Sequence, residues 1–170
     1  MIKKILLGLL AVLVIIQFFR PEKNDSNDQQ NHVSTKYEMP LEVASILKGA
    51  CDDCHTNKTE YPWYANVQPA AWWLADHVED GKRQLNFSNF TSRTIAVQNH
   101  KFEEVVEMVE EKEMPLPSYT WMGLHPEAAL TDGQRQVLVN WVKAQMDTLK
   151  ANYPADSLVM RRPSNPQPGK

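Results

Sequence analysis

The chain has 170 residues, of which 42% are hydrophobic, and its net charge is −3. Because it has no basic excess, it lacks the electrostatic footprint of a nucleic-acid-binding protein, and we expect no nucleic-acid partner. Between the polar segments near its two ends lie about 115 residues, enough for one small domain over residues 38–153.

Residues 1–20 begin with two lysines and continue as an apolar run. Residues 5–19 contain one polar side chain, Gln17. These roughly 15 residues reach about 22 Å as a helix, which is short for a membrane span of about 20 residues. A signal peptide ends in small residues, whereas this run ends in Phe18 and Phe19, so we expect an uncleaved membrane anchor with the domain facing the periplasm. The alternative is cleavage, which would leave a soluble periplasmic protein.

Two polar segments flank the domain. Residues 21–37 start with a run that has no apolar side chain to attach it to a core, which predicts a flexible linker. Residues 154–170 are rich in proline and predict a disordered tail.

Helical periodicity recurs along the domain, and no segment has the alternating pattern of a strand. Apolar residues spaced by three and four positions predict helices over residues 41–51, 69–83 and 101–112. A capping box formed by Thr131 and Gln134 predicts the start of a last helix. We therefore expect an all-α domain. The aromatic side chains of residues 61–73 are expected mostly in its core, as are Phe87 and Phe90.

The chain's only two cysteines occur in the sequence Cys51-Asp52-Asp53-Cys54-His55, called the CxxCH motif below. This spacing is typical of c-type haem attachment, in which both thiols bond to the porphyrin and His55 is the proximal iron ligand. We expect the other ring nitrogen of His55 to donate to a backbone carbonyl near Pro62 or Pro69. A thioredoxin-like disulfide would need a βαβ context, and a structural zinc site would need more ligands than one such pair.

Several further segments accompany the motif, and together they resemble a bacterial family of single-CxxCH haem-binding domains over about residues 40–150. The segments are Tyr61-Pro62-Trp63-Tyr64, Pro69-Ala70-Ala71-Trp72-Trp73, Leu85-Asn86-Phe87-Ser88, Met114-Pro115-Leu116-Pro117-Ser118-Tyr119 and His125-Pro126-Glu127-Ala128. More broadly, the chain resembles a class I c-type cytochrome. This resemblance implies cytochrome c-like helices around one covalent haem c, with the first and last helices of the domain crossing.

The class I resemblance also implies that a methionine from the late loop is the sixth iron ligand. Met114 is the first candidate, because a thioether opposite histidine raises the reduction potential. Met122 is the second candidate. Bis-histidine ligation through His77, His100 or His125 is the third.

These observations predict a mono-haem cytochrome that transfers single electrons and is not itself an enzyme. One alternative is a haem-based sensor with an open or displaceable sixth position, and another is a peroxidase-like enzyme with an acid–base residue such as His125. The glutamates of residues 103–111 form either a solvated face or a docking surface for a basic redox partner.

Overall fold

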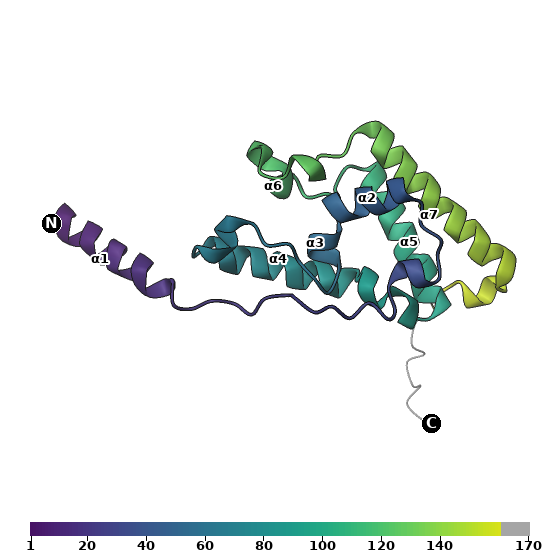
Figure 1. Ribbon diagram of the computed structural model, residues 1–170, viewed down its shortest axis with the longest axis horizontal. Helices are drawn as coiled ribbons and strands as arrows, with labels where there is room; N and C mark the ends of the chain where they lie inside the picture. The colour runs from purple at the N-terminus through teal and green to yellow at the C-terminus, as the bar shows by residue number, and fades with distance from the viewer. Residues whose placement is uncertain (161–170) are drawn as a thin grey trace, which may run out of the picture.

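A computed structural model describes residues 1–160 of the chain, apart from the side chain of Met122 (Figure 1). Within that range the backbone forms no strand, and one isolated bridge joins Asp25 to Lys58. The α-helices are α1 (Ile2–Ile16), α2 (Leu41–Ala50), α3 (Asp52–His55), α4 (Ala70–Gln84), α5 (Ile95–Glu110), α6 (Pro117–Thr120) and α7 (Asp132–Asn152). Short 3₁₀ helices complete them: η1 (Val33–Thr35), η2 (Trp63–Asn66), η3 (Phe87–Ser92), η4 (Trp121–Gly123), η5 (Pro126–Ala128) and η6 (Ala155–Ser157). The predicted all-α class is confirmed.

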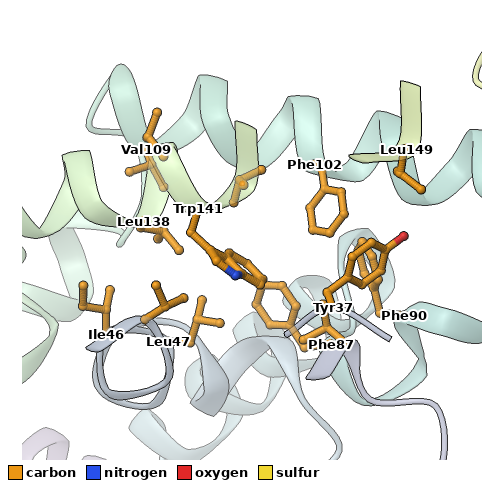
Figure 2. Close-up of a cluster of buried hydrophobic side chains, with 14 of the residues drawn as sticks. Tyr37, Ile46, Leu47, Phe87, Phe90, Phe102, Val109, Leu138, Trp141 and Leu149 are labelled. Carbon is orange, nitrogen blue, oxygen red and sulfur yellow. The ribbon is translucent and has the colours of Figure 1, made fainter. Parts of the chain in front are cut away.

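The core lies where α5 packs along α7 and α2 packs against α7 (Figure 1). Figure 2 shows Trp141 of α7 above Leu47 of α2, and Phe102 of α5 beside Tyr37 and Phe90. The Trp141 indole keeps a polar partner, because its N–H donates to the Glu38 carbonyl at 2.9 Å. The burial of these apolar faces positions α2, and the CxxCH motif follows α2 directly.

Three of the four predicted helices appear with nearly the expected limits, as α2, α4 and α7. The capping box of α7 is present, with the Thr131 hydroxyl accepting from the Gln134 N–H. The third helix, α5, starts six residues before the predicted position, at Ile95. Its first turns bury Gln98 and Asn99, and two buried amides interrupt the apolar pattern from which a helix is recognised.

Residues 21–37, predicted to be a flexible linker, lie against the domain instead. We call them the N-terminal strap. The Asn24 side chain donates to the Thr56 carbonyl and to the Thr59 hydroxyl, both at 2.9 Å. Val33 and Tyr37 are buried in the core. Hydrogen bonds from amide side chains hold much of the strap, and these depend on partners distant in sequence that composition does not reveal.

The C-terminal segment also packs in part. Leu158 is buried within the core cluster, although residues 154–170 were predicted to be a disordered tail. The rest of that prediction, residues 161–170, lies outside the residues that the structure describes.

Helix α1 extends away from the domain, and residues 1–15 are exposed (Figure 1). Among residues 1–160, no helix combines the length and the apolar character required to cross a membrane.

The tryptophans of residues 61–73 are not in the core, and their predicted core packing is wrong. Trp63 is 75% exposed, Trp72 38% and Trp73 43%. The predicted core packing of Phe87 and Phe90 is confirmed: both are buried, and Phe90 packs between Phe102 of α5 and Tyr37 of the strap. Aromatic residue type alone does not distinguish a core residue from a surface one, because Trp is common in both settings.

Candidate functional site

The CxxCH motif consists of Cys51, which ends α2, and the single turn of α3. The His55 N–H donates to the Cys51 carbonyl at 2.9 Å, and the Cys54 N–H donates to the same carbonyl at 3.2 Å. This turn directs the two thiols and the imidazole to the same side, and all three side chains line one cavity of about 640 Å³. Both cysteines are free thiols.

The cavity is surrounded by helices from every part of the domain and is lined mainly by apolar side chains. Its size lies within the range of about 300–1,000 Å³ that is usual for cofactor pockets. The apolar residues of its wall include Leu47, Ala50, Leu85, Phe87, Val105, Met108, Val109, Met114, Pro115, Leu116 and Leu138. Such a wall suits a large, flat, apolar molecule with few polar edges.

His55 is oriented by the last turn of α4. Its Nδ1 lies 3.0 Å from the carbonyl oxygens of Gly81 and of Leu85. Because carbonyls only accept, Nδ1 carries the proton and Nε2 keeps the lone pair that a metal ligand requires. Burial lowers the pKa of His55, which favours this neutral form. The carbonyls were predicted near Pro62 or Pro69. They come instead from the C-terminal end of α4, where the Gly81 carbonyl also accepts from the Leu85 N–H and the carbonyl of the capping residue Leu85 lies beyond the helix.

Gly81 is a site residue that the sequence analysis did not identify. A Cβ atom at this position would lie 2.6 Å from the Cys54 carbonyl oxygen. Only glycine therefore lets α4 approach the motif closely enough for its carbonyls to reach His55. The available signal was a glycine inside an otherwise helical segment, which often marks a close contact between backbones.

The two thiols are neutral. Burial raises the pKa of Cys51 to about 12 and that of Cys54 to about 11. Zinc coordination and thiol–disulfide exchange both use the thiolate, which this burial disfavours. In the part of the chain that the structure describes, no three His, Cys, Asp or Glu side chains group together as a metal site.

Met114 lines the same cavity as His55. Arg135 of α7 holds its backbone, with Nη1 donating to the Met114 carbonyl at 2.6 Å and to the Val109 carbonyl at 3.1 Å. A second thioether, Met108 of α5, also lines the cavity. Neither Arg135 nor Met108 was identified from sequence, because each occupies an ordinary position on an amphipathic helix.

Tyr119 ties the segment that follows Met114 back to the CxxCH motif. Its hydroxyl donates to Asp53 Oδ2 at 2.7 Å. Burial, and then the adjacent Asp53 carboxylate, raise the pKa of Tyr119, so the hydroxyl keeps its proton and remains a donor. This bond joins the two sides of the cavity across 66 positions of sequence.

The other candidate iron ligands differ in where they lie relative to the cavity. His77 lines the cavity, and its Nδ1 lies 2.8 Å from the Trp73 carbonyl. His100 is instead paired with Glu103 and Glu104 on the surface of α5. The side chain of Met122 lies outside the residues that the structure describes.

His125 is buried, and both of its ring nitrogens have partners. Its Nε2 is 2.6 Å from the Tyr64 hydroxyl, and its Nδ1 is 3.2 Å from Glu127. Its ring also stacks on Tyr119, with centroids 3.9 Å apart. These contacts join η2 to the segment that carries α6 and η5.

Two of the segments that carry the family resemblance, residues 85–88 and 114–119, bond to the CxxCH motif, whereas Trp72 of the segment 69–73 bonds to Phe19. Beyond the Tyr119 and His125 contacts, the Ser88 hydroxyl accepts from the Asn57 N–H at 3.0 Å, and Asn86 donates to the Asn57 side chain at 2.8 Å. Residues scattered along the sequence therefore form one hydrogen-bonded surround for residues 51–57.

The model of the haem-binding domain family matches residues 11–144. The chain belongs to the haem-binding domain family. Neither the curated proteins nor the solved structures include a match to it.

The residues of the site fit the haem that this family implies. The cavity is large and mainly apolar, His55 presents a neutral imidazole, and glycine clears the approach of α4 to the motif. At the end of α4, Lys82 bonds to Asn24 and Arg83 bonds to Asp80.

Proposed function

We propose that this haem-binding protein is a mono-haem c-type cytochrome that carries out one-electron transfer outside the cytoplasmic membrane. The observation that carries the proposal is the cavity itself: Met114, which is distant in sequence from the CxxCH motif, lines the same space as Cys51, Cys54 and His55. A covalent haem needs the first three, and a six-coordinate electron carrier needs a fourth residue such as Met114.

In this proposal the chain's residues hold and orient the cofactor. Each thiol, Cys51 or Cys54, adds across one vinyl group, forming a carbon–sulfur bond while its hydrogen passes to the neighbouring carbon, so no oxidant is consumed. His55 ligates through Nε2 while the carbonyls of Gly81 and Leu85 fix its ring. When bound, haem supplies an iron that exchanges one electron between ferrous and ferric states.

Met114 is the proposed sixth ligand. Arg135 fixes the Met114 backbone, which lowers the entropy cost of holding the thioether in place. A sixth position that Met114 keeps filled favours electron transfer over the peroxidase-like alternative, which needs that position open, and over a sensor, which needs it open or displaceable. The contacts of His125 with Tyr64 and Glu127 do not favour the role of a distal acid–base residue.

Membrane attachment and partner choice are further parts of the proposal. Helix α1 anchors the protein, with Lys3 and Lys4 on the cytoplasmic side and the domain in the periplasm. The acidic face of residues 103–111 serves a basic redox partner. Glu104 and Glu107 of this face also line the cavity, so negative charge lies beside the site from which an electron would leave.

The test is expression of the full chain in a host that matures c-type cytochromes. We expect a haem stain that survives denaturing electrophoresis and a weak methionine–iron absorption band at the red end of the spectrum. Replacing Cys51 and Cys54 by alanine should abolish the stain, and Met114→Leu should abolish only the band. A persistent stain in the double-cysteine variant would overturn covalent attachment, and a high-spin ferric spectrum of the intact protein would overturn the electron-transfer assignment.

A further inference from the structure

Most of the chain's tryptophans lie on its surface. Trp141 is 7% exposed, whereas the exposed fractions are 75% for Trp63, 38% for Trp72, 43% for Trp73 and 67% for Trp121. Tryptophan is highly buried on average, because its large apolar area is costly to leave in water. Exposed apolar residues that gather in one region mark a surface that contacts something else.

The four exposed tryptophans come from connected segments of the domain. Trp63 begins η2, which packs against α4, and Trp72 and Trp73 lie in the first turn of α4. Trp121 follows α6, whose segment is joined to η2 through the bond between Tyr64 and His125. In Figure 1 the first turn of α4 and the tip of α6 lie on the side of the domain that faces α1.

Helix α1 leaves the domain from this same region. The Phe19 carbonyl accepts from the Trp72 indole N–H at 2.9 Å and from the Gln68 side chain at 2.7 Å. Gln17 and Gln68 add a reciprocal pair, in which the Gln68 N–H donates at 2.9 Å and the Gln17 amide donates to the Gln68 carbonyl at 3.2 Å. Gln68 is buried, so these hydrogen bonds hold the end of α1 in a fixed position against the domain.

The length of α1 determines how deep in a bilayer the contact between α1 and the domain would lie. Its 15 residues span about 22 Å, less than the roughly 30 Å of a typical hydrocarbon core. A helix this short draws both of its ends into the interfacial region. Phe18 and Phe19, which are 82% and 62% exposed, would then lie among the headgroups together with the residues bonded to them.

The chemistry of the region matches a lipid interface. Tryptophan concentrates at the boundary between headgroups and acyl chains, where its ring is apolar and its N–H finds a partner. Cations flank the junction: Arg20 donates to the Gln17 carbonyl, and the Lys23 ammonium lies 5.2 Å from the centre of the Tyr61 ring. Positive side chains at this level attract anionic headgroups.

We propose that this tryptophan face, made of Phe18, Phe19, Trp63, Trp72, Trp73 and Trp121, lies on the bilayer surface and holds the haem-binding domain against the membrane in one orientation. The proposal rests on the membrane attachment proposed above and goes beyond it, because an anchor alone does not determine which face of the domain contacts the lipid. Docking keeps the cavity at a constant height above the lipid.

The experiment uses the full chain in vesicles of phosphatidylcholine and phosphatidylglycerol that carry a photoactivatable group near the top of the acyl chain. After illumination, mass spectrometry locates the labelled peptides. We expect label on residues 61–73 and 117–124 as well as on residues 1–19. Label confined to residues 1–19 would overturn docking while leaving membrane attachment intact, and an unlabelled chain would overturn both.

Variants separate lipid contact from simple exposure. Trp63→Ser combined with Trp73→Ser and Trp121→Ser should reduce labelling of the domain peptides by about tenfold, with residues 1–19 labelled as before. The matched control is Leu41→Ser with Val159→Ser, because these side chains are 89% and 63% exposed on other segments. Haem content and circular dichroism verify folding. Equal labelling of the two variants, or cross-links from the tryptophan face to a second copy without lipid label, would overturn the proposal.

Discussion

The wall of the cavity that carries His55 and the wall that carries Met114 are built from different kinds of structure. Backbone groups orient His55: a turn of the motif, two carbonyls of α4, and a glycine that permits their approach. Met114 lies in the segment between α5 and α6, and side chains hold that segment through the bonds of Arg135 and Tyr119.

The proposed function gives the two walls different roles: the His55 wall attaches the haem, and the Met114 wall adjusts the ligation of its iron. A wall held by helix backbone tolerates change at many side chains but not at the points of closest approach. A wall held by single side-chain bonds can be loosened one bond at a time without unfolding the domain. We therefore expect substitutions on the His55 wall to affect folding and haem loading, and substitutions on the Met114 wall to affect ligation.

Gly81→Ala should have the largest effect. The new methyl group meets the Cys54 carbonyl at 2.6 Å, so α4 must shift, and we expect a loss of about 1–3 kcal/mol in the free energy of unfolding together with reduced haem loading. Thermal unfolding and haem content per chain measure both.

Gly133→Ala is the matched control for this effect. It adds the same methyl group to a helix where the nearest atom is 3.9 Å away, so stability should stay constant or rise by up to about 1 kcal/mol. Equal stability of the two variants would show that the α4 backbone does not restrict the His55 wall.

Met114→Leu should come next. Leucine keeps the volume of the apolar wall but removes the thioether, so we expect the methionine–iron band to disappear and the reduction potential to fall while haem stays attached. Near-infrared absorption and redox titration report these changes. Met108→Leu is the control, since Met108 lines the same cavity; a band lost only in Met108→Leu would reassign the sixth ligand to α5.

Tyr119→Phe removes one bond between the two walls. We expect a loss of about 1–2 kcal/mol in stability, because the donated bond ends on a carboxylate. On heating, the methionine–iron band of Tyr119→Phe should also weaken at a lower temperature than the band of the parent protein. A double-mutant cycle with Asp53→Asn isolates the bond. Tyr61→Phe, whose hydroxyl accepts from the Asn24 N–H of the strap, should leave the band unaltered.

The smallest effect concerns pH and the His55 wall. Burial, reinforced by Asp53, raises the pKa of Asp52 to about 6. The folded protein therefore holds a proton that the unfolded chain has lost, and Asp52 makes stability fall as pH rises from about 4 to about 6.

Asp52→Asn removes this titration. The variant should be more stable than the parent by about 1 kcal/mol at pH 7, after allowance for screening by solvent, and should lose that advantage near pH 4. Chemical unfolding at the two pH values measures the difference. Asp147→Asn, at an exposed residue paired with Lys150, is the control; the same pH dependence there would remove the assignment to Asp52.

Features that depend on neighbouring residues could be predicted from sequence, and features that depend on distant segments could not. The CxxCH motif and the Thr131 capping box are local patterns whose geometry is completed within a few residues, so both could be read directly. The placement of Met114 in the cavity followed from a resemblance to other proteins. The carbonyl partners of His55 were misassigned, because proline segments close in sequence offered plausible acceptors while the true ones come from the end of α4.

By itself, the sequence determined the all-helical class and the tight turn of residues 51–55, because both arise from interactions within a few turns of chain. It also determined the apolar character of residues 1–20, which depends on composition alone. Only the tertiary structure decided which carbonyls orient His55, that the strap is bonded to the domain, and that four tryptophans are exposed, with Trp72 bonded to Phe19 just after α1. Those features depend on which distant segments meet, and burial of one shared core, not local pattern, sets that arrangement.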